Sequence, residues 1–226
     1  MNQVAERAVW DWEFAWNVLP RIWGGMVVII QATLLGITIA MILGLFLALG
    51  RRSQRKWIAW PFAAFIDFIR STPLLIQLFF VFFALPDLGI VLTAMTSLVL
   101  GLGVHYATYA SEAYRAGIEA VEAGQWEAAT ALNLGPATTW RKVILPQAIP
   151  KVIPALGNFL VAMIKDAPLG SSIGVVGVLF VARSVGSQTF RYVETMTIAG
   201  VLFLAVSIPA ALFVQFLERK YGYEAA

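Results

Sequence analysis

The chain has 226 residues, of which 60% are hydrophobic and only 13% are charged, and its formal net charge is +3. A soluble domain carries about 25% charged residues, so this composition predicts a membrane protein. The absence of cysteine excludes disulfides and thiol chemistry, and the single histidine excludes a histidine-rich metal site. With no Ser–His–Asp arrangement either, we expect no catalytic residue and no metal site.

Residues 1–21 do not have the pattern of a cleaved signal, because they lack a basic start, an apolar core and a small-residue cleavage site. Instead, Trp10, Trp12, Phe14 and Trp16 alternate with polar residues. Indole rings favour the membrane–water interface, so we expect residues 1–21 to form an interfacial segment. The alternative is a disordered tail, although such tails are poor in aromatic residues.

Five apolar stretches follow, each long enough, at about 20 residues, to cross a bilayer as a helix. They are Ile22–Leu49, Ile58–Leu85, Ile90–Ser111, Ile149–Leu169 and Thr195–Leu217. We therefore predict an all-α, polytopic membrane protein with about five transmembrane helices, in which residues 1–226 form a single transmembrane domain.

The basic residues predict the orientation of these spans. Ten of the 16 fall in the segments on one side, against four on the other side and two within spans. The positive-inside rule then places the N-terminus outside and the C-terminus in the cytoplasm. Since this asymmetry also accounts for the net charge, the charge gives no indication of nucleic-acid binding.

A polar loop between the third and fourth spans, residues 117–148, contains the sequence EAATALNLGPATTWRKVILP. Ala, Glu and Gln, which form helices well, dominate Ile118–Asn133. The run Asn133-Leu134-Gly135-Pro136 predicts the end of that helix. We expect Thr138 and Thr139 to cap a second short helix, and Pro146 to begin the return to the membrane. Two such helices would form a knob able to seat in a groove of another protein.

This loop resembles the cytoplasmic EAA loop of ABC-importer permeases, in which EAA is followed by a Gly and then by Ile-x-Leu-Pro. The matching residues are Glu127, Ala128, Ala129, Leu145 and Pro146, with Val143 at the Ile position and Asn133 at the Gly position. Asn is the residue after Gly that best tolerates a left-handed backbone, so Asn133 suits that position.

The resemblance extends over nearly the whole chain and is specific to the polar amino-acid uptake branch. Phe65–Phe80 resembles a segment in which an acidic residue precedes Phe-Arg-Gly-Thr-Pro-Leu-Leu, with Ser71 replacing the Gly. Asn158 and the pair Lys165-Asp166 match the fourth span. The resemblance implies the type I ABC importer permease fold, with residues 117–148 as the loop that couples to ATP hydrolysis and Glu127 pairing with a basic residue of the ATPase.

The resemblance also implies the partners of the chain. They are an ATP-binding ABC subunit carrying ATP and Mg, a second permease chain that is a copy or a relative, and an extracytoplasmic solute-binding protein. The assembly would lie in the lipid of the bacterial cytoplasmic membrane. The chain itself lacks the phosphate-binding Gly-x-x-x-x-Gly-Lys-Ser/Thr loop, so we expect no cofactor bound to it and no enzymatic activity.

Charges within spans mark transport pathways or ion pairs. Asp67 and Arg70 are three residues apart on one helix face, and Lys165 and Asp166 are adjacent. Each pair presents both signs of charge, which suits a zwitterion, although a pair can also serve only to pin helices together. Four further residues complete the candidates: His105 and Tyr109, four apart, as lining of the same cavity, and Glu112 and Arg115 as a structural or gating pair.

One departure from the family bears on the solute. Where the family usually continues Lys-Asp with Thr-Ser-Leu, this chain has Ala167-Pro168-Leu169. Two hydroxyls are lost and Pro168 has no N–H to donate, which favours a compact zwitterionic compatible solute such as ectoine over a typical polar amino acid. The alternative function is a secondary transporter or channel not coupled to ATP, but such proteins typically show paired inverted repeats, and no internal repeat is visible.

Overall fold

The computed structural model describes residues 10–221, which form helices joined by short turns, with no strand among them. The α-helices are α1 Trp12–Arg51, α2 Lys56–Arg70, α3 Leu74–Phe79, α4 Ala94–Glu119, α5 Ala123–Ala131, α6 Pro136–Thr139, α7 Leu145–Asp166, α8 Val178–Thr189 and α9 Tyr192–Tyr221. Tighter or wider helical turns follow α3 (Phe80–Ala84 and Leu85–Leu88), join α6 to α7 (Trp140–Ile144) and extend α7 (Ala167–Ile173). The predicted all-α fold is confirmed.

Helix α1 has 40 residues and begins where the Asp11 carboxylate accepts the Phe14 N–H at 3.0 Å. At 1.5 Å per residue it is about 60 Å long, twice the thickness of the hydrocarbon core. Residues 12–21, expected as a separate segment ahead of the first span, are therefore the first turns of the same helix. Trp12 and Trp16 are exposed there. The remainder of the predicted interfacial segment, residues 1–9, lies outside the described residues.

Among the described residues, three helical segments are long and apolar enough to cross a membrane: Trp12–Arg51, Pro136–Ile173 and Tyr192–Lys220. A fourth candidate is the pair Lys56–Arg70 and Leu74–Leu88, which is bent by 104°. The prediction of one continuous helix over Ile58–Leu85 is therefore wrong. Pro73 causes the break, because it has no N–H to donate and disfavours a helical backbone at the residue before it.

Helix α4 replaces the predicted third span but is not among those candidates. Its buried side carries Ser97, Thr108 and Ser111, which lower its apolar character. The reason lies in its position, because α4 packs along α1 and against α7 and faces protein instead of lipid. Among the described residues, the five predicted spans thus correspond to three single helices, one bent pair and the more polar helix α4. The sequence did not predict α8, a helix of 12 residues.

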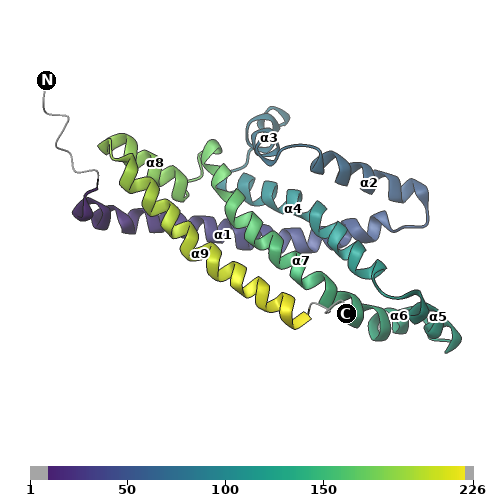
Figure 1. The fold of residues 1–226 in the computed structure, drawn as a ribbon. Helices are drawn as coiled ribbons and strands as arrows, with labels where there is room; N and C mark the ends of the chain where they lie inside the picture. The colour runs from purple at the N-terminus through teal and green to yellow at the C-terminus, as the bar shows by residue number, and fades with distance from the viewer. Residues whose placement is uncertain (1–9, 222–226) are drawn as a thin grey trace, which may run out of the picture.

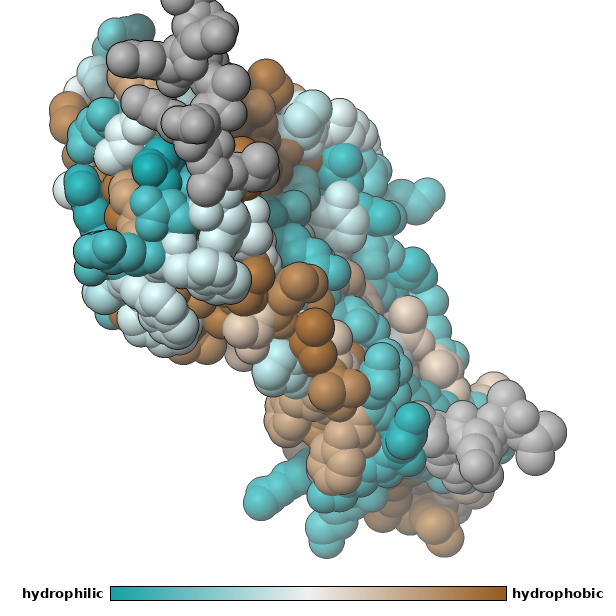
Figure 2. Space-filling model, turned by 60° about the vertical axis from the view of Figure 1, so that its left-hand side comes forward, coloured by the Kyte–Doolittle hydropathy of each residue, from teal (hydrophilic) through white to brown (hydrophobic). Residues whose placement is uncertain are grey.

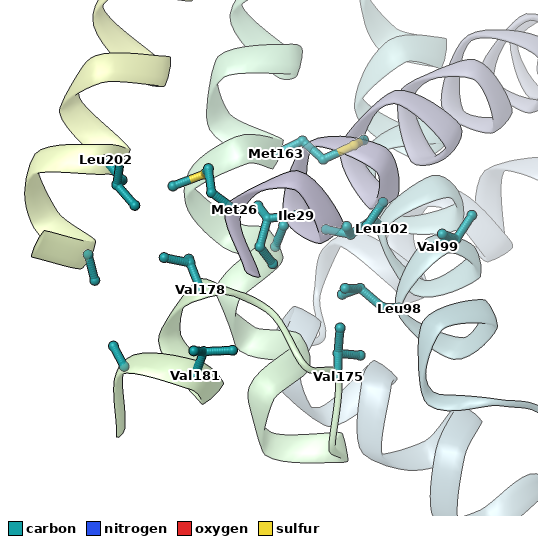
Figure 3. Close-up of a cluster of buried hydrophobic side chains, with 14 of the residues drawn as sticks. Met26, Ile29, Leu98, Val99, Leu102, Met163, Val175, Val178, Val181 and Leu202 are labelled. Atoms are coloured by element: carbon teal, nitrogen blue, oxygen red, sulfur yellow. The ribbon is translucent and has the colours of Figure 1, made fainter. Parts of the chain in front are cut away.

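The core lies where α1, α4, α7 and α8 meet. Met26 and Ile29 of α1 lie beside Leu98 and Leu102 of α4 and Met163 of α7, as Figure 3 shows. Outside this core, large apolar side chains reach the surface between the two ends of the molecule (Figure 2). Such a surface is suited to lipid, in agreement with a membrane protein.

The two ends of the molecule differ. In Figure 1, α5 and α6 project at one end, near the C-terminal end of α9, whereas α8 and the start of α1 lie at the other. The loop expected in the cytoplasm thus lies at the same end as the last turns of α9, which precede the C-terminus expected there. This agreement concerns only the relative placement of the segments, so the inside–outside orientation stays a prediction.

Adjacent glycines in α1 give a matched test of the packing. A Cβ on Gly25 would lie 2.7 Å from the backbone nitrogen of Val178, whereas a Cβ on Gly24 would meet nothing within 4 Å. We expect Gly25→Ala to destabilise the protein by about 1–3 kcal/mol, because backbone cannot move aside as a flexible side chain can. Gly24→Ala should leave stability unchanged or slightly raised. Thermal unfolding in detergent measures both, and equal midpoints would contradict this account of the α1–α8 contact.

Candidate functional site

The end of α5 has the backbone predicted for it. Asn133 adopts a left-handed backbone with φ of 52°. The Leu134 N–H donates to the Ala129 carbonyl at 3.0 Å, and the Asn133 N–H donates to the Thr130 carbonyl at 2.9 Å. This hydrogen-bond pattern is a Schellman motif, which usually requires Gly at the left-handed position. The substitution of Asn for Gly in the EAA pattern therefore preserves the turn.

The knob, residues 117–148, has a small core of its own. Buried Ile118, Val121 and Ile144 pack with the indole rings of Trp126 and Trp140, whose centroids lie 5.4 Å apart. The second helix differs from the prediction, since α6 begins at Pro136 without a threonine cap and continues into α7. A π-helical turn at Trp140–Ile144 widens the helix just before Pro146, whose missing N–H falls in the first turn of α7, so the proline does not interrupt it.

The residues of the EAA pattern divide between the surface and the core of the knob. Ala129 is buried, whereas the other predicted residues, Glu127, Ala128, Asn133, Leu145 and Pro146, are exposed. Leu132, beside them, is 71% exposed. An exposed acid and a small alanine on α5, with an exposed leucine at its C-cap, form a surface suited to another protein.

The predicted pair Asp67–Arg70 does not form. Asp67 is exposed and has no ion pair with any described residue. Arg70, the last residue of α2, instead places its guanidinium 5.1 Å from the centre of the Tyr109 ring, and its Nη1 lies 3.8 Å from Glu112 Oε1. The break after α2 turns Arg70 toward α4, where a partly buried carboxylate and an aromatic face attract it more than an exposed aspartate does.

The pair Lys165–Asp166 also separates, because successive residues of a helix point about 100° apart. The Tyr106 hydroxyl donates to Asp166 Oδ2 at 2.7 Å. Lys165 is exposed and lines a cavity of about 270 Å³ between the end of α7 and α9, together with Pro168 and Phe203. The alternative, in which each pair neutralises itself and only pins helices together, therefore does not describe either site.

Four of the predicted residues nevertheless meet in one place. The His105 ring lies 5.5 Å from Tyr106 and 5.2 Å from Tyr109, measured between ring centres, and its Nδ1 lies 3.1 Å from Gln77 Oε1. Phe159 of α7 lies within 6.3 Å of both tyrosine rings. We call this group the polar–aromatic cluster; its members are Arg70, Gln77, His105, Tyr106, Tyr109, Phe159 and Asp166.

Sequence reasoning missed Gln77, Tyr106 and Phe159. Gln77 gave a signal, since it is the one amide in the apolar run after Pro73. Its Nε2 donates to the carbonyls of Ile69 at 2.7 Å and Thr72 at 3.0 Å, and so adds a side-chain link across the helix break. Gln77 thereby fixes the bend that delivers Arg70 to the cluster. Nothing in the local pattern distinguished Tyr106 or Phe159 from packing residues.

Below the cluster, Glu112 joins three helices. The predicted contact with Arg115 is present at 2.7 Å, and the same carboxylate accepts a hydrogen bond from Arg51 of α1 and lies near Arg70 of α2. Three guanidinium groups thus surround a carboxylate that is only 20% exposed. Among the described residues, no group of three or more His, Cys, Asp or Glu side chains could hold a metal ion.

A helical bundle with an apolar surface, charged residues between its helices and a knob at one end defines a transport permease that works with other proteins. The chain belongs to the family of binding-protein-dependent transport system inner membrane components, whose sequence pattern matches residues 36–223. This match and the relatives below together confirm the predicted ABC-importer permease of the amino-acid branch.

Relatives support this assignment. The chain is 45% identical over 205 residues to a probable amino-acid ABC transporter permease protein of Sinorhizobium fredii, covering 91% of this chain and 89% of that protein. It is 33% identical to a probable amino-acid ABC transporter permease protein of Bacillus subtilis, covering 94% and 97%. A crystal structure of an amino acid ABC transporter with histidines matches with a TM-score of 0.88 at 34% identity, covering 93% of this chain and 99% of that one.

Proposed function

We propose that this chain forms the membrane pathway of an ATP-driven importer for a zwitterion, either a polar amino acid or a compact compatible solute such as ectoine. The observation that carries the proposal is the polar–aromatic cluster. Arg70 lies against Tyr109 and Asp166 against Tyr106, and the His105 ring contacts both tyrosines. Opposite charges thus flank one group of aromatic rings, as a zwitterion requires. The identity to probable amino-acid permeases supports the same class of solute.

Arg70 and Asp166 both have hydrogen-bonding groups left over for a solute. No hydrogen bond joins the Arg70 guanidinium to another described residue, and its nearest carboxylate oxygen is 3.8 Å away. A guanidinium in that state can bind a solute carboxylate through two N–H groups. Asp166 accepts one hydrogen bond at Oδ2, which leaves Oδ1 for an ammonium group. The aromatic rings then supply an apolar wall and a face for the cation.

The energy source and the partners complete the proposal. The knob docks onto a separate ATP-binding subunit, which holds ATP and Mg, while this chain performs no catalysis. A second permease chain, identical or related, lies beside it in the bacterial cytoplasmic membrane, and an extracytoplasmic solute-binding protein delivers the solute. Glu127 and its exposed neighbours on the knob form the docking surface.

Reconstitution tests the proposal directly. The chain, its ATP-binding subunit and its solute-binding protein are placed in proteoliposomes, and uptake of a labelled polar amino acid or of labelled ectoine is followed. Uptake should require ATP on the side of the membrane that carries the ATP-binding subunit. It should continue in the presence of an uncoupler. Uptake that proceeds without ATP and stops with an uncoupler would instead support a secondary transporter. Competition among amino acids and ectoine identifies the solute class.

A reporter fusion tests the orientation. A reporter active only outside the cytoplasm should work near Asp87 or Ser187 and should be inactive near Ser53, Gln125 or the C-terminus. The reason is the excess of basic residues on the side that contains the knob. The reverse pattern of activity would overturn both the orientation and the assignment of the knob as an ATPase-docking loop.

A further inference from the structure

Two consecutive arginines at the end of α1 link the knob to the polar–aromatic cluster. We propose that Arg51 and Arg52 are positioning residues that couple movement of the knob to the solute site. The proposal rests on the proposed function, since it assigns a path between the ATPase-docking surface and the cluster. It is argued from four successive contacts, each of which joins different helices.

The first contact joins the knob to α1. The Arg52 Cζ lies 5.6 Å from the ring centre of Trp126 and 5.3 Å from that of Trp140. Trp126 belongs to α5 and directly precedes Glu127, whereas Trp140 begins the turn that leads into α7. Trp is the aromatic residue that binds a cation most strongly. One guanidinium therefore holds both halves of the knob against the end of α1.

The second contact joins α1 to α4. Arg51, the neighbour of Arg52, forms an ion pair with Glu112. The third joins α4 to α2, because the same Glu112 oxygen lies 3.8 Å from Arg70 Nη1. Arg115 holds the other oxygen at 2.7 Å. Since the guanidinium groups share one partly buried carboxylate, displacement of Arg51 changes the field at Arg70.

The fourth contact reaches the cluster, where the Arg70 Cζ lies 5.1 Å from the centre of the Tyr109 ring. Arg70 is also the last residue of α2 before the 104° bend. Coupling between distant sites needs an element with two arrangements, and in this proposal the bend after Arg70 has that role. A shift of the knob that pulls on Arg52 would thus reposition Arg70, and with it the group assigned to the solute carboxylate.

The chain offers a matched control for Arg52. Arg55 lies three residues further in the same loop, is exposed, and its side chain has no hydrogen bond, ion pair or ring contact with a described residue. Arg55→Gln removes the same charge from the same loop as Arg52→Gln. It does so without removing a contact to the knob, so the two variants separate the role of the contact from the role of the charge.

The experiment measures solute molecules imported per ATP hydrolysed by the complete reconstituted complex. Arg52→Gln should lower this ratio about tenfold, which is within the usual range of coupling between sites. Arg55→Gln should keep the parent ratio. Arg52→Lys should give an intermediate ratio, because an ammonium retains attraction to the rings but lacks the planar guanidinium. A residue that only stabilises the fold would instead lower the amount of assembled complex and leave this ratio unchanged.

A second measurement combines Arg52→Gln with Trp140→Leu. If the two residues act through one contact, the ratio of solute imported to ATP hydrolysed should be no lower in the double variant than in the more affected single variant. The proposal would be overturned if Arg52→Gln left the ratio unchanged or if Arg55→Gln lowered it equally. It would also be overturned if the losses of the two single variants added fully in the double variant. Loss of the ATP-binding subunit from Arg52→Gln would assign Arg52 to assembly and would overturn it too. Failure of the proposed function looks different, because the parent complex itself would then show no ATP-dependent uptake.

Discussion

Glu127→Lys is expected to abolish uptake and to release the ATP-binding subunit from the membrane chain. Glu127 is exposed on α5 and has no hydrogen bond or ion pair with any described residue, so its replacement leaves the fold of the chain intact. Its exposed neighbour Ala128 is small and allows close approach of a partner. If Glu127 meets a basic residue there, a lysine places two like charges together, which costs several kcal/mol.

Losing several kcal/mol of binding free energy between the knob and the ATP-binding subunit lowers uptake by roughly a hundredfold or more. Uptake and co-purification of the ATP-binding subunit measure the effect. The control is Glu122→Lys, which makes the same change of charge five residues earlier, at the exposed residue that precedes α5. Normal uptake by Glu127→Lys with the ATP-binding subunit still bound would show that this loop is not the docking surface.

The sequence predicted the features of the fold that depend on neighbouring residues. The left-handed backbone of Asn133 followed from the place of Asn in a helix-ending run, and the structure has it. The EAA residues were placed on a projecting loop because their composition differs from that of the spans. The length of the apolar run Ile58–Leu85 predicts one helix, but the backbone restriction that Pro73 imposes breaks it before Leu74.

The charged residues show where sequence spacing stops being informative. Sequence spacing indicates on which side of its own helix a residue lies. It does not indicate which other helix packs against that side. Spacing therefore predicts Asp67 as the partner of Arg70, whereas in the structure Arg70 lies beside Glu112 and Tyr109. Likewise, Asp166 is bound by Tyr106, 60 residues away in the chain. All three partners come from α4, the helix that packs at the centre of the bundle, and no local pattern identifies them.

Asp166→Asn is expected to leave the complex assembled but to lower uptake by about a hundredfold. The amide keeps an oxygen that can accept the hydrogen bond of the Tyr106 hydroxyl, so the contact at 2.7 Å has a neutral replacement. What is lost is the negative charge, and a charged hydrogen bond within a binding site contributes roughly 2–5 kcal/mol. Asp67→Asn is the matched control, because Asp67 is exposed and outside the cluster.

Lys165 provides the decisive comparison. It adjoins Asp166 in the chain but lines the cavity beside α9, so a pathway through the polar–aromatic cluster predicts a smaller effect for Lys165→Gln than for Asp166→Asn. Uptake rates over a range of solute concentrations measure both variants, with assembly checked by co-purification. If Lys165→Gln lost uptake while Asp166→Asn retained it, the solute would pass on the α9 side of α7. The cluster would then be a structural contact between α4 and α7, and Arg70 would owe its position to Glu112 alone.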